Sequence, residues 1–228
     1  MATITTPKTP TGTLASVLGH EVVTSMVQSY KFMQKFTIVG ISSILYLRTE
    51  LNNNAFAKVK VDNVKMTMLD KEHPQGKELL TLLKQALVPL KEGFLRELHV
   101  LFVRSSDPDS IVEQHTFKYK SPKNSKGNAD NAETATPKQK ENALRFQFQK
   151  LLKNLGVANQ SLSSLPDDVE MRVRLIYDEK APNNYEVEGF VAASPASISK
   201  VRFVEVPPTP IKYGSLKTKW HQCDASVQ

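Results

Sequence analysis

Residues 169–190 read VEMRVRLIYDEKAPNNYEVEGF, and this stretch is the most specific structural signal in the chain. In its first half, the apolar residues Val169, Met171 and Val173 alternate with charged residues. That period of two is typical of a strand that buries one face. A proline and two asparagines follow, which favour a turn. The stretch therefore predicts one strand over residues 169–178 and a change of chain direction directly after it.

Upstream of this strand, the hydrophobic pattern predicts a mixture of helices and short strands. Apolar residues recur at helical spacing over residues 17–51, 75–94 and 137–156. Pro89 should kink or end the second of these helices, and Thr136 and Gly156 are the expected caps of the third. Shorter runs predict strands over residues 56–61, 64–69, 98–103, 112–120, 200–206 and 211–220. The expected fold class is α+β, with a largely antiparallel sheet.

Two segments lack the composition of packed structure. Residues 1–13 are rich in threonine and proline, and we expect them to form a flexible tail. Residues 121–136 contain no aliphatic side chain larger than alanine and no aromatic ring. Because such a segment has nothing to bury, we expect it to be a disordered loop.

The overall composition indicates one globular domain. Of 228 residues, 40% are hydrophobic and 23% are charged, which is ordinary globular usage. No apolar run approaches the length of a membrane helix, and the N-terminus lacks a secretory signal pattern. Cys223 is the only cysteine, so no internal disulfide can form, which fits a reducing cytosolic or nuclear compartment. The net charge of +7 permits attraction to nucleic acid, but the basic residues are dispersed, which favours a solvated basic surface.

The sequence contains none of the motifs expected of an enzyme, a metal site or a cofactor site. The five histidines are scattered, without the paired spacing of a zinc-binding helix. His99 and His115 fall on neighbouring predicted strands, where a structural role is favoured over metal binding. No glycine-rich phosphate loop is present. Asp167-Asp168 follows a proline, so a turn is the simpler explanation of that pair. We therefore expect no catalytic activity, no metal and no cofactor.

Several short motifs carry a family resemblance when they are taken in order along the chain. They are Tyr46-Leu47-Arg48, Leu95-Arg96, Phe117-Lys118-Tyr119, Leu165-Pro166, the stretch 176–185 and Gly189-Phe190. In this order and spacing they resemble the meiotic HORMA-domain proteins of the chromosome axis. The resemblance implies three main helices packed on a largely antiparallel, mixed sheet. It places the HORMA domain at residues 14–222, a C-terminal "safety belt" at 179–222 and a short remnant at 223–228.

The resemblance also implies a mechanism. In family members, a short peptide called the closure motif adds as a strand beside the strand that matches residues 169–178, and the belt crosses over it. A terminal hairpin, here 200–220, docks on the opposite edge of the sheet, here 112–120. Only residues 224–228 follow the belt, without the family's long tail that carries its own closure motif. We expect either a truncated chain or one that captures motifs only from other proteins.

Two groups of residues form the predicted sites. The residues expected to bind the peptide are Glu170, Arg172, Val173, Arg174, Ile176, Tyr185 and Phe190. The residues expected to dock the belt are Val201, Phe203, Tyr213, Leu216 and Trp220. Arg172 and Arg174 either select an acidic or polar motif or belong to a solvated sheet face. Trp220 is favoured as a core anchor of the last strand over a direct ligand contact.

The resemblance implies a non-enzymatic adaptor that assembles the meiotic chromosome axis in the nucleus. Its expected partners are closure-motif peptides of related HORMA proteins or of axis and cohesin-associated scaffold proteins. Head-to-tail self-assembly and an indirect association with chromatin, but not with membranes, belong to the same expectation. Two alternatives stay open: a checkpoint or DNA-repair HORMA adaptor, and a basic nucleic-acid-binding domain. Salt dependence separates the last of these, because phosphate binding weakens steeply with salt.

Overall fold

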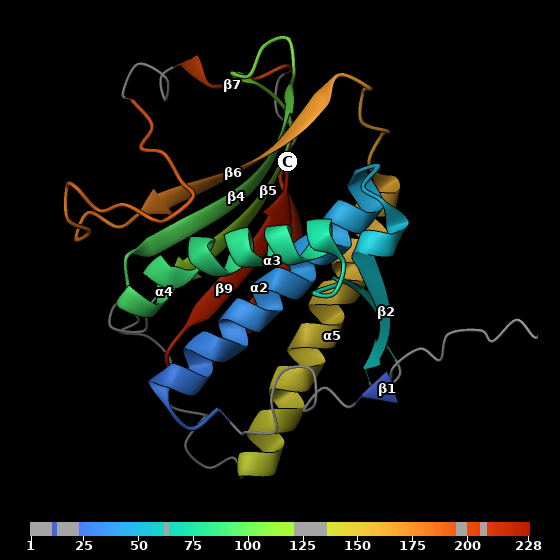
Figure 1. Ribbon diagram of the computed structural model, residues 1–228. Coiled ribbons are helices and arrows are strands. Elements are labelled where there is room, and N and C mark those ends of the chain that lie inside the picture. Colours follow the sequence, from blue (N-terminus) through green and yellow to red (C-terminus); the bar gives the residue numbers. More distant parts are fainter. Residues whose placement is uncertain (1–10, 13–22, 62–63, 121–135, 195–199, 206–208) are drawn as a thin grey trace, which may run out of the picture.

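The computed structural model describes residues 11–12, 23–61, 64–120, 136–194, 200–205 and 209–228 (Figure 1). A large sheet forms one layer, and the long helices form a second layer over one of its faces. The main hydrophobic core lies between these layers. This arrangement confirms the predicted α+β class, with three main helices on a largely antiparallel sheet.

Helix α2 (Met26–Arg48) runs through the middle of the domain (Figure 1). Ser25 caps its start and forms a capping box with Gln28, which satisfies backbone N–H groups that have no partner within the helix. Its fully buried side chains include Met33, Phe36, Ile41 and Ile44. The predicted helix 17–51 is therefore shorter than expected, and residues 13–22 lie outside the described residues.

A small three-stranded sheet packs beside α2. The short helix η1 (Asn53–Ala55) leads into β2 (Phe56–Val61), which pairs antiparallel with β3 (Val64–Leu69). Both strands of the predicted hairpin are confirmed, while its turn at 62–63 lies outside the described residues. The two-residue strand β1 (Thr11–Gly12) adds to β2 in parallel. This part of the predicted flexible tail is therefore strand, because pairing with a sheet edge needs backbone groups rather than apolar side chains.

The predicted helix 75–94 is divided in two. Helix α3 (Pro74–Ala86) ends at Leu87, where α4 (Val88–Glu92) begins. The break is placed here because Pro89 has no N–H for an intrahelical bond and is accommodated in the first turn of a new helix. Gly93 then ends α4 with a φ of 80°, a left-handed conformation that favours glycine.

Helix α5 (Pro137–Ser161) starts where the sequence predicts but ends later. The Thr136 hydroxyl oxygen accepts a hydrogen bond from the Gln139 N–H at 3.3 Å. The predicted cap at Gly156 is wrong, because the helix continues to Ser161 and buries Ala158 and Asn159. The predicted disordered loop, apart from Thr136, lies outside the described residues.

The large sheet has the strand order β6-β4-β5-β9-β8. These strands are β4 (Leu95–Arg104), β5 (Ser110–Lys120), β6 (Val169–Tyr177), β8 (Ile211–Lys217) and β9 (Gln222–Val227). All of these neighbours are antiparallel, whereas the two-residue β7 (Arg202–Phe203) pairs with β5 in parallel. The strands predicted at 98–103, 112–120 and 169–178 are therefore confirmed to within a few residues.

The C-terminal hairpin, which consists of β8 and β9, differs most from prediction. The expected strand 200–206 is reduced to β7, and the expected strand 211–220 ends at Lys217. Residues 223–228 are not a remnant, because β9 lies between β5 and β8 and buries Cys223, Ala225 and Val227. The sequence QCDASV gives little sign of this, since small and polar residues have low strand propensity and only tertiary pairing makes them a strand.

Candidate functional site

The outer edge of β6 lies at one end of the large sheet. β6 pairs with β4 on one side, and no strand of the described residues pairs with it on the other. At one end of this ladder, the Ser105 N–H donates to the Asp168 carbonyl oxygen at 2.7 Å. Hydrogen-bonded pairs alternate along an antiparallel ladder. The register of β4 and β6 therefore turns the backbone groups of even-numbered β6 residues toward β4.

The odd-numbered residues Met171, Val173 and Leu175 consequently turn their N–H and C=O groups away from β4, and we name this side of β6 the open edge. A row of such backbone groups is a template for another strand. The side chains of the same residues pack against the main core. A strand added at the open edge would therefore be held by backbone hydrogen bonds rather than by these side chains.

Four of the predicted peptide-binding side chains flank the open edge on the outer face of the sheet. Glu170 and Arg172 are exposed, and their charged groups are 3.5 Å apart. Arg174 is half-buried and lies opposite His99 of β4, and this burial lowers the pKa of its guanidinium. Ile176 is half-buried on the same face. Val173, by contrast, offers only its backbone to the open edge.

The start of the predicted belt is fastened to the body of the domain. The Tyr185 hydroxyl donates to Glu92 Oε2 at 2.5 Å, and the Tyr185 ring packs edge-to-face against Phe94 and Tyr177. Burial and the Glu92 carboxylate raise the pKa of this hydroxyl. Phe190 packs against the main core. Tyr185 and Phe190 are thus placed as anchors of the belt to the helical layer.

Further along the chain, β7 pairs with Ser110 and Ile111 at the start of β5, near the ends of the strands that lie away from this anchor (Figure 1). Val201 and Phe203 pack there against a second, smaller apolar cluster on the outer face. The cluster consists of Leu101, Val103 and Ile111. The belt therefore begins just beyond the end of β6 and is held again at the start of β5, with residues 195–199 outside the described part of the chain.

The C-terminal hairpin pairs with the other edge of β5, so that β8 becomes the outer strand on that side of the sheet. β9 pairs with β5 from His115 to Lys120, which is the edge predicted for the docked hairpin. Tyr213 and Leu216 of β8 are fully buried. Trp220 is half-buried in the turn between the strands, with the Lys219 ammonium 5.5 Å from its ring centroid. Trp220 is therefore a turn residue and not the core anchor expected of it.

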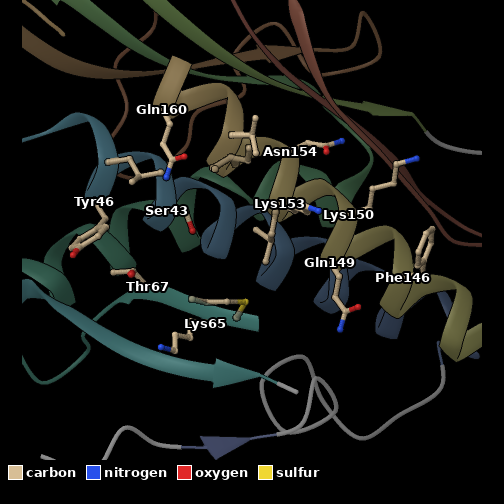
Figure 2. A pocket seen from close by; sticks show the side chains of 16 residues that line it. Ser43, Tyr46, Lys65, Thr67, Phe146, Gln149, Lys150, Lys153, Asn154 and Gln160 are labelled. Carbon is tan, nitrogen blue, oxygen red and sulfur yellow. The ribbon is translucent and has the colours of Figure 1, made fainter. Parts of the chain in front are cut away.

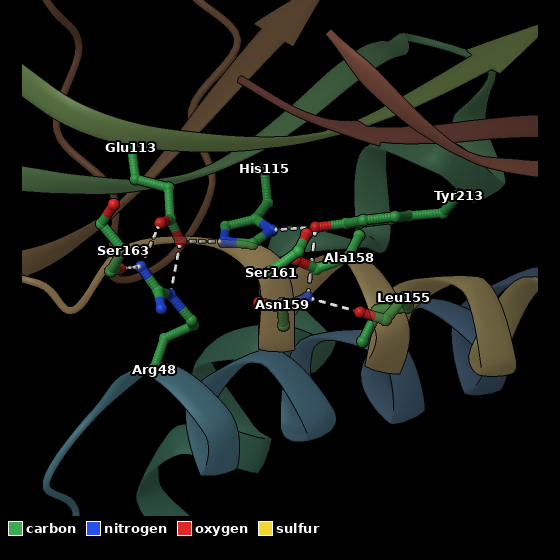
Figure 3. A network of polar contacts seen from close by, with 9 residues as sticks. All are labelled: Arg48, Glu113, His115, Leu155, Ala158, Asn159, Ser161, Ser163 and Tyr213. Atoms are coloured by element: carbon green, nitrogen blue, oxygen red, sulfur yellow. Dashed lines mark hydrogen bonds and ion pairs between the residues drawn. The ribbon is translucent and has the colours of Figure 1, made fainter.

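A buried polar network holds β8 against the domain (Figure 3). We name it the docking network; its members are Arg48, Glu113, His115, Asn159 and Tyr213. Arg48 Nε donates to Glu113 Oε1 at 2.9 Å, and the second guanidinium nitrogen bonds the other carboxylate oxygen. The same carboxylate lies 2.6 Å from His115 Nε2, and His115 Nδ1 lies 2.6 Å from the Tyr213 hydroxyl. Asn159 Nδ2 donates to that hydroxyl at 3.3 Å.

Electrostatics within the docking network follow from its burial. Burial lowers the pKa of His115 and so favours the neutral ring, although Glu113 opposes this. Burial alone would raise the pKa of Glu113, but hydrogen bonds from His115 and Arg48 hold it below its usual value. The ionised Glu113 carboxylate therefore joins β5 to Arg48 of α2. The His115 imidazole joins β5 to Tyr213 of β8. Polar groups that are buried together in this way fix one arrangement.

A second polar contact fastens the tip of the hairpin. Ser29 of α2 lies 2.7 Å from Thr218 Oγ1 and 2.7 Å from Nδ1 of His221. Both Ser29 and His221 are buried, and burial lowers the pKa of His221. The tip and the docking network hold the hairpin at two separated points along α2.

Sequence reasoning missed the docking network as a unit, although it named Tyr213 as a docking residue and placed Arg48 in a motif. Glu113 and His115 share the core-facing side of β5 with Phe117 and Tyr119. A carboxylate and an imidazole at apolar positions of a strand were the signal that could have revealed a buried pair. His99 and His115 lie on opposite faces of the sheet, each bonded to the glutamate two residues before it, so they do not meet.

No group of three or more His, Cys, Asp or Glu side chains is arranged to hold a metal ion within the described ranges. In the same part of the chain, no helix has the length and hydrophobicity to cross a bilayer.

A family model described as the HORMA domain matches residues 29–221. The match covers most of the chain, so the protein belongs to the HORMA domain family. It runs from the first turn of α2 to the turn before β9, and includes the open edge and the docking network. The family resemblance drawn from the short motifs is thereby confirmed.

Curated relatives share the domain at low identity. The chain is 25% identical to HORMA domain-containing protein 1 of Mus musculus over 222 residues, covering 92% of this chain and 54% of the relative. For the Homo sapiens protein of the same name, the identity is 25% over 232 residues, and the coverage is 97% and 56%. HORMA domain-containing protein 2 of Mus musculus is 22% identical, with 90% and 68% covered. The chain thus spans about half the length of the first of these relatives.

Solved structures share the fold. C. elegans HTP-1 bound to the HIM-3 closure motif has a TM-score of 0.75 at 20% identity, covering 93% of this chain and 94% of that chain. C. elegans HTP-2 bound to HTP-3 closure motif 1 has a TM-score of 0.74 at 21% identity, covering 90% and 87%. A chain of a Mitotic Checkpoint Complex has a TM-score of 0.65 at 16% identity, covering 87% and 97%. At these identities the likeness establishes the HORMA fold.

Proposed function

We propose that this protein is a non-enzymatic adaptor that captures a short peptide of a partner protein. The peptide adds as a strand at the open edge, and the belt passes over it. The single observation that carries this proposal is an edge strand with outward backbone groups, whose following segment is fastened to α4 just beyond that strand and again to the start of β5. An added strand gains two backbone hydrogen bonds at each of Met171, Val173 and Leu175.

The belt should slow dissociation of the bound peptide in addition to any effect on affinity. A peptide enclosed between β6 and a fastened segment cannot leave until that segment opens. Such opening breaks the Tyr185–Glu92 hydrogen bond and the packing of Phe190. Slow dissociation is therefore expected, since differences in affinity between related complexes lie mostly in the dissociation rate.

We place this capture in the assembly of meiotic chromosome axes in the nucleus. The C. elegans structures with this fold are bound to closure motifs of HTP-3 and HIM-3, and the curated relatives are HORMA domain-containing proteins 1 and 2. By this reasoning the partners are closure-motif peptides of related HORMA proteins or of axis and cohesin-associated scaffold proteins. The likeness to a chain of a Mitotic Checkpoint Complex supports a second candidate, a checkpoint adaptor that uses the same edge.

The test removes one outward N–H of the open edge. Val173→Pro deletes that donor without costing a bond to β4, because the N–H of residue 173 points away from β4. Val173→Ala is the matched control, since it also shortens the side chain but keeps the N–H. A peptide selected from a random display library against the native protein serves as probe, with affinity and dissociation rate measured by fluorescence anisotropy and folding by circular dichroism.

Capture at the open edge predicts much weaker binding to Val173→Pro than to Val173→Ala. Equal binding by the two folded variants would refute strand addition. If Val173→Pro does not fold, the backbone hydrogen bonds are tested from the other side, by N-methylating the peptide backbone at alternate residues. Affinity should change little between low and high salt, whereas nucleic-acid binding would weaken steeply.

A further inference from the structure

A groove lies on the helical side of the domain, away from the open edge. It has a volume of about 920 Å³ and lies between α5 and β3, with α2 contributing Ser43, Tyr46 and Leu47 (Figure 2). None of its lining residues belongs to β6 or to the belt. Whatever binds here does so independently of strand capture.

Three large apolar side chains of this groove are exposed. Phe146 is 64% exposed, Val157 is 60% exposed and Leu47 is 40% exposed. Single exposed apolar residues are common on protein surfaces. Three that line one concave surface mark an interaction site instead.

The charged residues of the groove all have the same sign. Its lining includes Lys65, Lys150 and Lys153 but no aspartate or glutamate. Among the described residues, none of these lysines forms an ion pair. The groove therefore combines apolar surface with uncompensated positive charge, which is complementary to an acidic and apolar partner.

Gly156 is the one lining residue without a side chain. It lies inside α5, where a glycine destabilises the helix relative to alanine. A Cβ at this position would meet nothing within 4 Å, so packing within the described residues does not require a glycine. The missing side chain at Gly156 leaves room for another chain to approach the helix closely.

Four of the lining residues of α5 form one stripe. Phe146, Lys150, Lys153 and Val157 follow at intervals of four, three and four residues. This spacing puts them on one face of the helix, over a length of roughly 16 Å. The stripe has an apolar residue at each end and lysines between them. An antiparallel or parallel helix of about three turns would match this length.

We propose that this groove binds an acidic amphipathic helix of a partner protein. The partner's apolar side chains contact Phe146, Val157 and Leu47, and its carboxylates pair with the three lysines. A second copy of this chain is a poor occupant, because each copy carries a net charge of +7. Nucleic acid would leave the exposed aliphatic groups of Leu47 and Val157 without a suitable contact.

The probe is a fluorescent designed peptide of about 14 residues, long enough to fill the groove, with leucines on one helical face and glutamates beside them. Its affinity is measured by fluorescence anisotropy, and its site by hydrogen exchange. Lys150→Glu with Lys153→Glu should weaken binding about tenfold, through the loss of two exposed charge pairs. Lys138→Glu with Lys140→Glu, on the same helix but outside the groove, is the matched control and should change affinity less than about twofold.

A second variant tests the apolar contact separately. Phe146→Ser should also weaken binding, and it should do so without loss of stability because the ring is mostly exposed. The exchange protection should map to residues 146–157. The variant with both Lys150→Glu and Lys153→Glu should still capture the display-selected peptide at the open edge. Failure of the groove is then distinguishable from failure of the open edge.

Four results would overturn the proposal. They are tighter binding of an oligothymidylate of equal charge, equal binding of polyglutamate, self-association that depends on Phe146, and no binding at about 1 mM peptide, near the weak end of measurable affinities. The first result would indicate a nucleic-acid surface and the second a charge effect without a groove. The third would make a second copy of this chain the occupant.

Discussion

The two sides of the large sheet differ in how a further strand is held there. On the β5 side, the chain supplies its own strands, and the docking network and the Ser29 contact bury polar groups to hold them. On the β6 side, the described residues supply no strand, and the flanking charged side chains of Glu170 and Arg172 are exposed. One edge is specified by side chains, whereas the other offers mainly its backbone.

The hairpin strands on the β5 side are a fixed part of the fold, whereas a strand added beside β6 can be exchanged. A buried network of hydrogen-bonded charged and polar groups selects one partner strand, because a substitute would leave charges unpaired. An edge that presents backbone groups accepts any extended chain, and discrimination falls to the side chains around it. Under the proposed function, the hairpin edge therefore contributes mainly to stability, and the open edge selects which peptide binds.

The strongest test of the hairpin edge is the loss of its central carboxylate. Glu113→Ala leaves the Arg48 guanidinium and His115 without their buried partner. Removing one side of a buried ion pair costs about 3–5 kcal/mol. We expect a fall of that size in the free energy of unfolding measured with urea. Glu170→Ala at the exposed face of β6 is the control and should change it by less than about 0.5 kcal/mol.

A smaller change in the same network should loosen β8 specifically. Tyr213→Phe keeps the buried ring but removes the hydroxyl that contacts His115 and Asn159. An unsatisfied buried polar group costs about 1–3 kcal/mol. Amide exchange in β8 and β9 should accelerate, while exchange in β6 should not. A uniform acceleration across all strands would mean that the hairpin does not open as a separate unit.

Acid should weaken the hairpin edge as well. The pKa values of His115 and His221 lie below the usual 6.5 because both rings are buried, and hydrogen bonds hold the pKa of Glu113 below 4.5 although burial opposes this. For all three groups, the unfolded chain binds protons at a higher pH than the folded protein. Stability that is present above about pH 6.5 is therefore lost as the pH falls, first through the histidines and then through Glu113.

The size of this pH effect is at most about 1.4 kcal/mol per pH unit for each histidine. The measurement is the free energy of unfolding between about pH 7.5 and about pH 5.5, across the ordinary histidine range. A stability that stays constant or rises toward acid would show that neither imidazole is buried in the neutral form.

The smallest effect on stability is expected at the open edge. Arg172→Glu combined with Arg174→Glu reverses the charge beside β6, yet it should lower the free energy of unfolding by less than about 1 kcal/mol. The set of peptides that bind should change, from acidic toward basic flanking residues. Selecting a display library against both proteins tests this. Identical peptide sets would show that the two arginines belong to a solvated face.

The sequence was sufficient for elements whose partners are close in the chain or whose pattern is strong. β6 alternates from Val169 to Leu175, α2 has a dense apolar pattern, and the capping signals of α5 predict its start. The end of α5 was misplaced because Gly156 resembles a cap, although burial of Ala158 and Asn159 carries the helix past it. Local signals fail where packing between distant segments outweighs them.

The sequence by itself determined the α+β class, the strand 169–178 and the family motifs, because periodicity and motif order are local properties. Only the tertiary structure showed that residues 222–227 form a central strand, since small polar residues become a strand when neighbours pair with them on both sides. It alone brought Arg48, Glu113, His115 and Tyr213 together. Contacts between residues far apart in sequence leave no periodic pattern, so they could be found only in the folded chain.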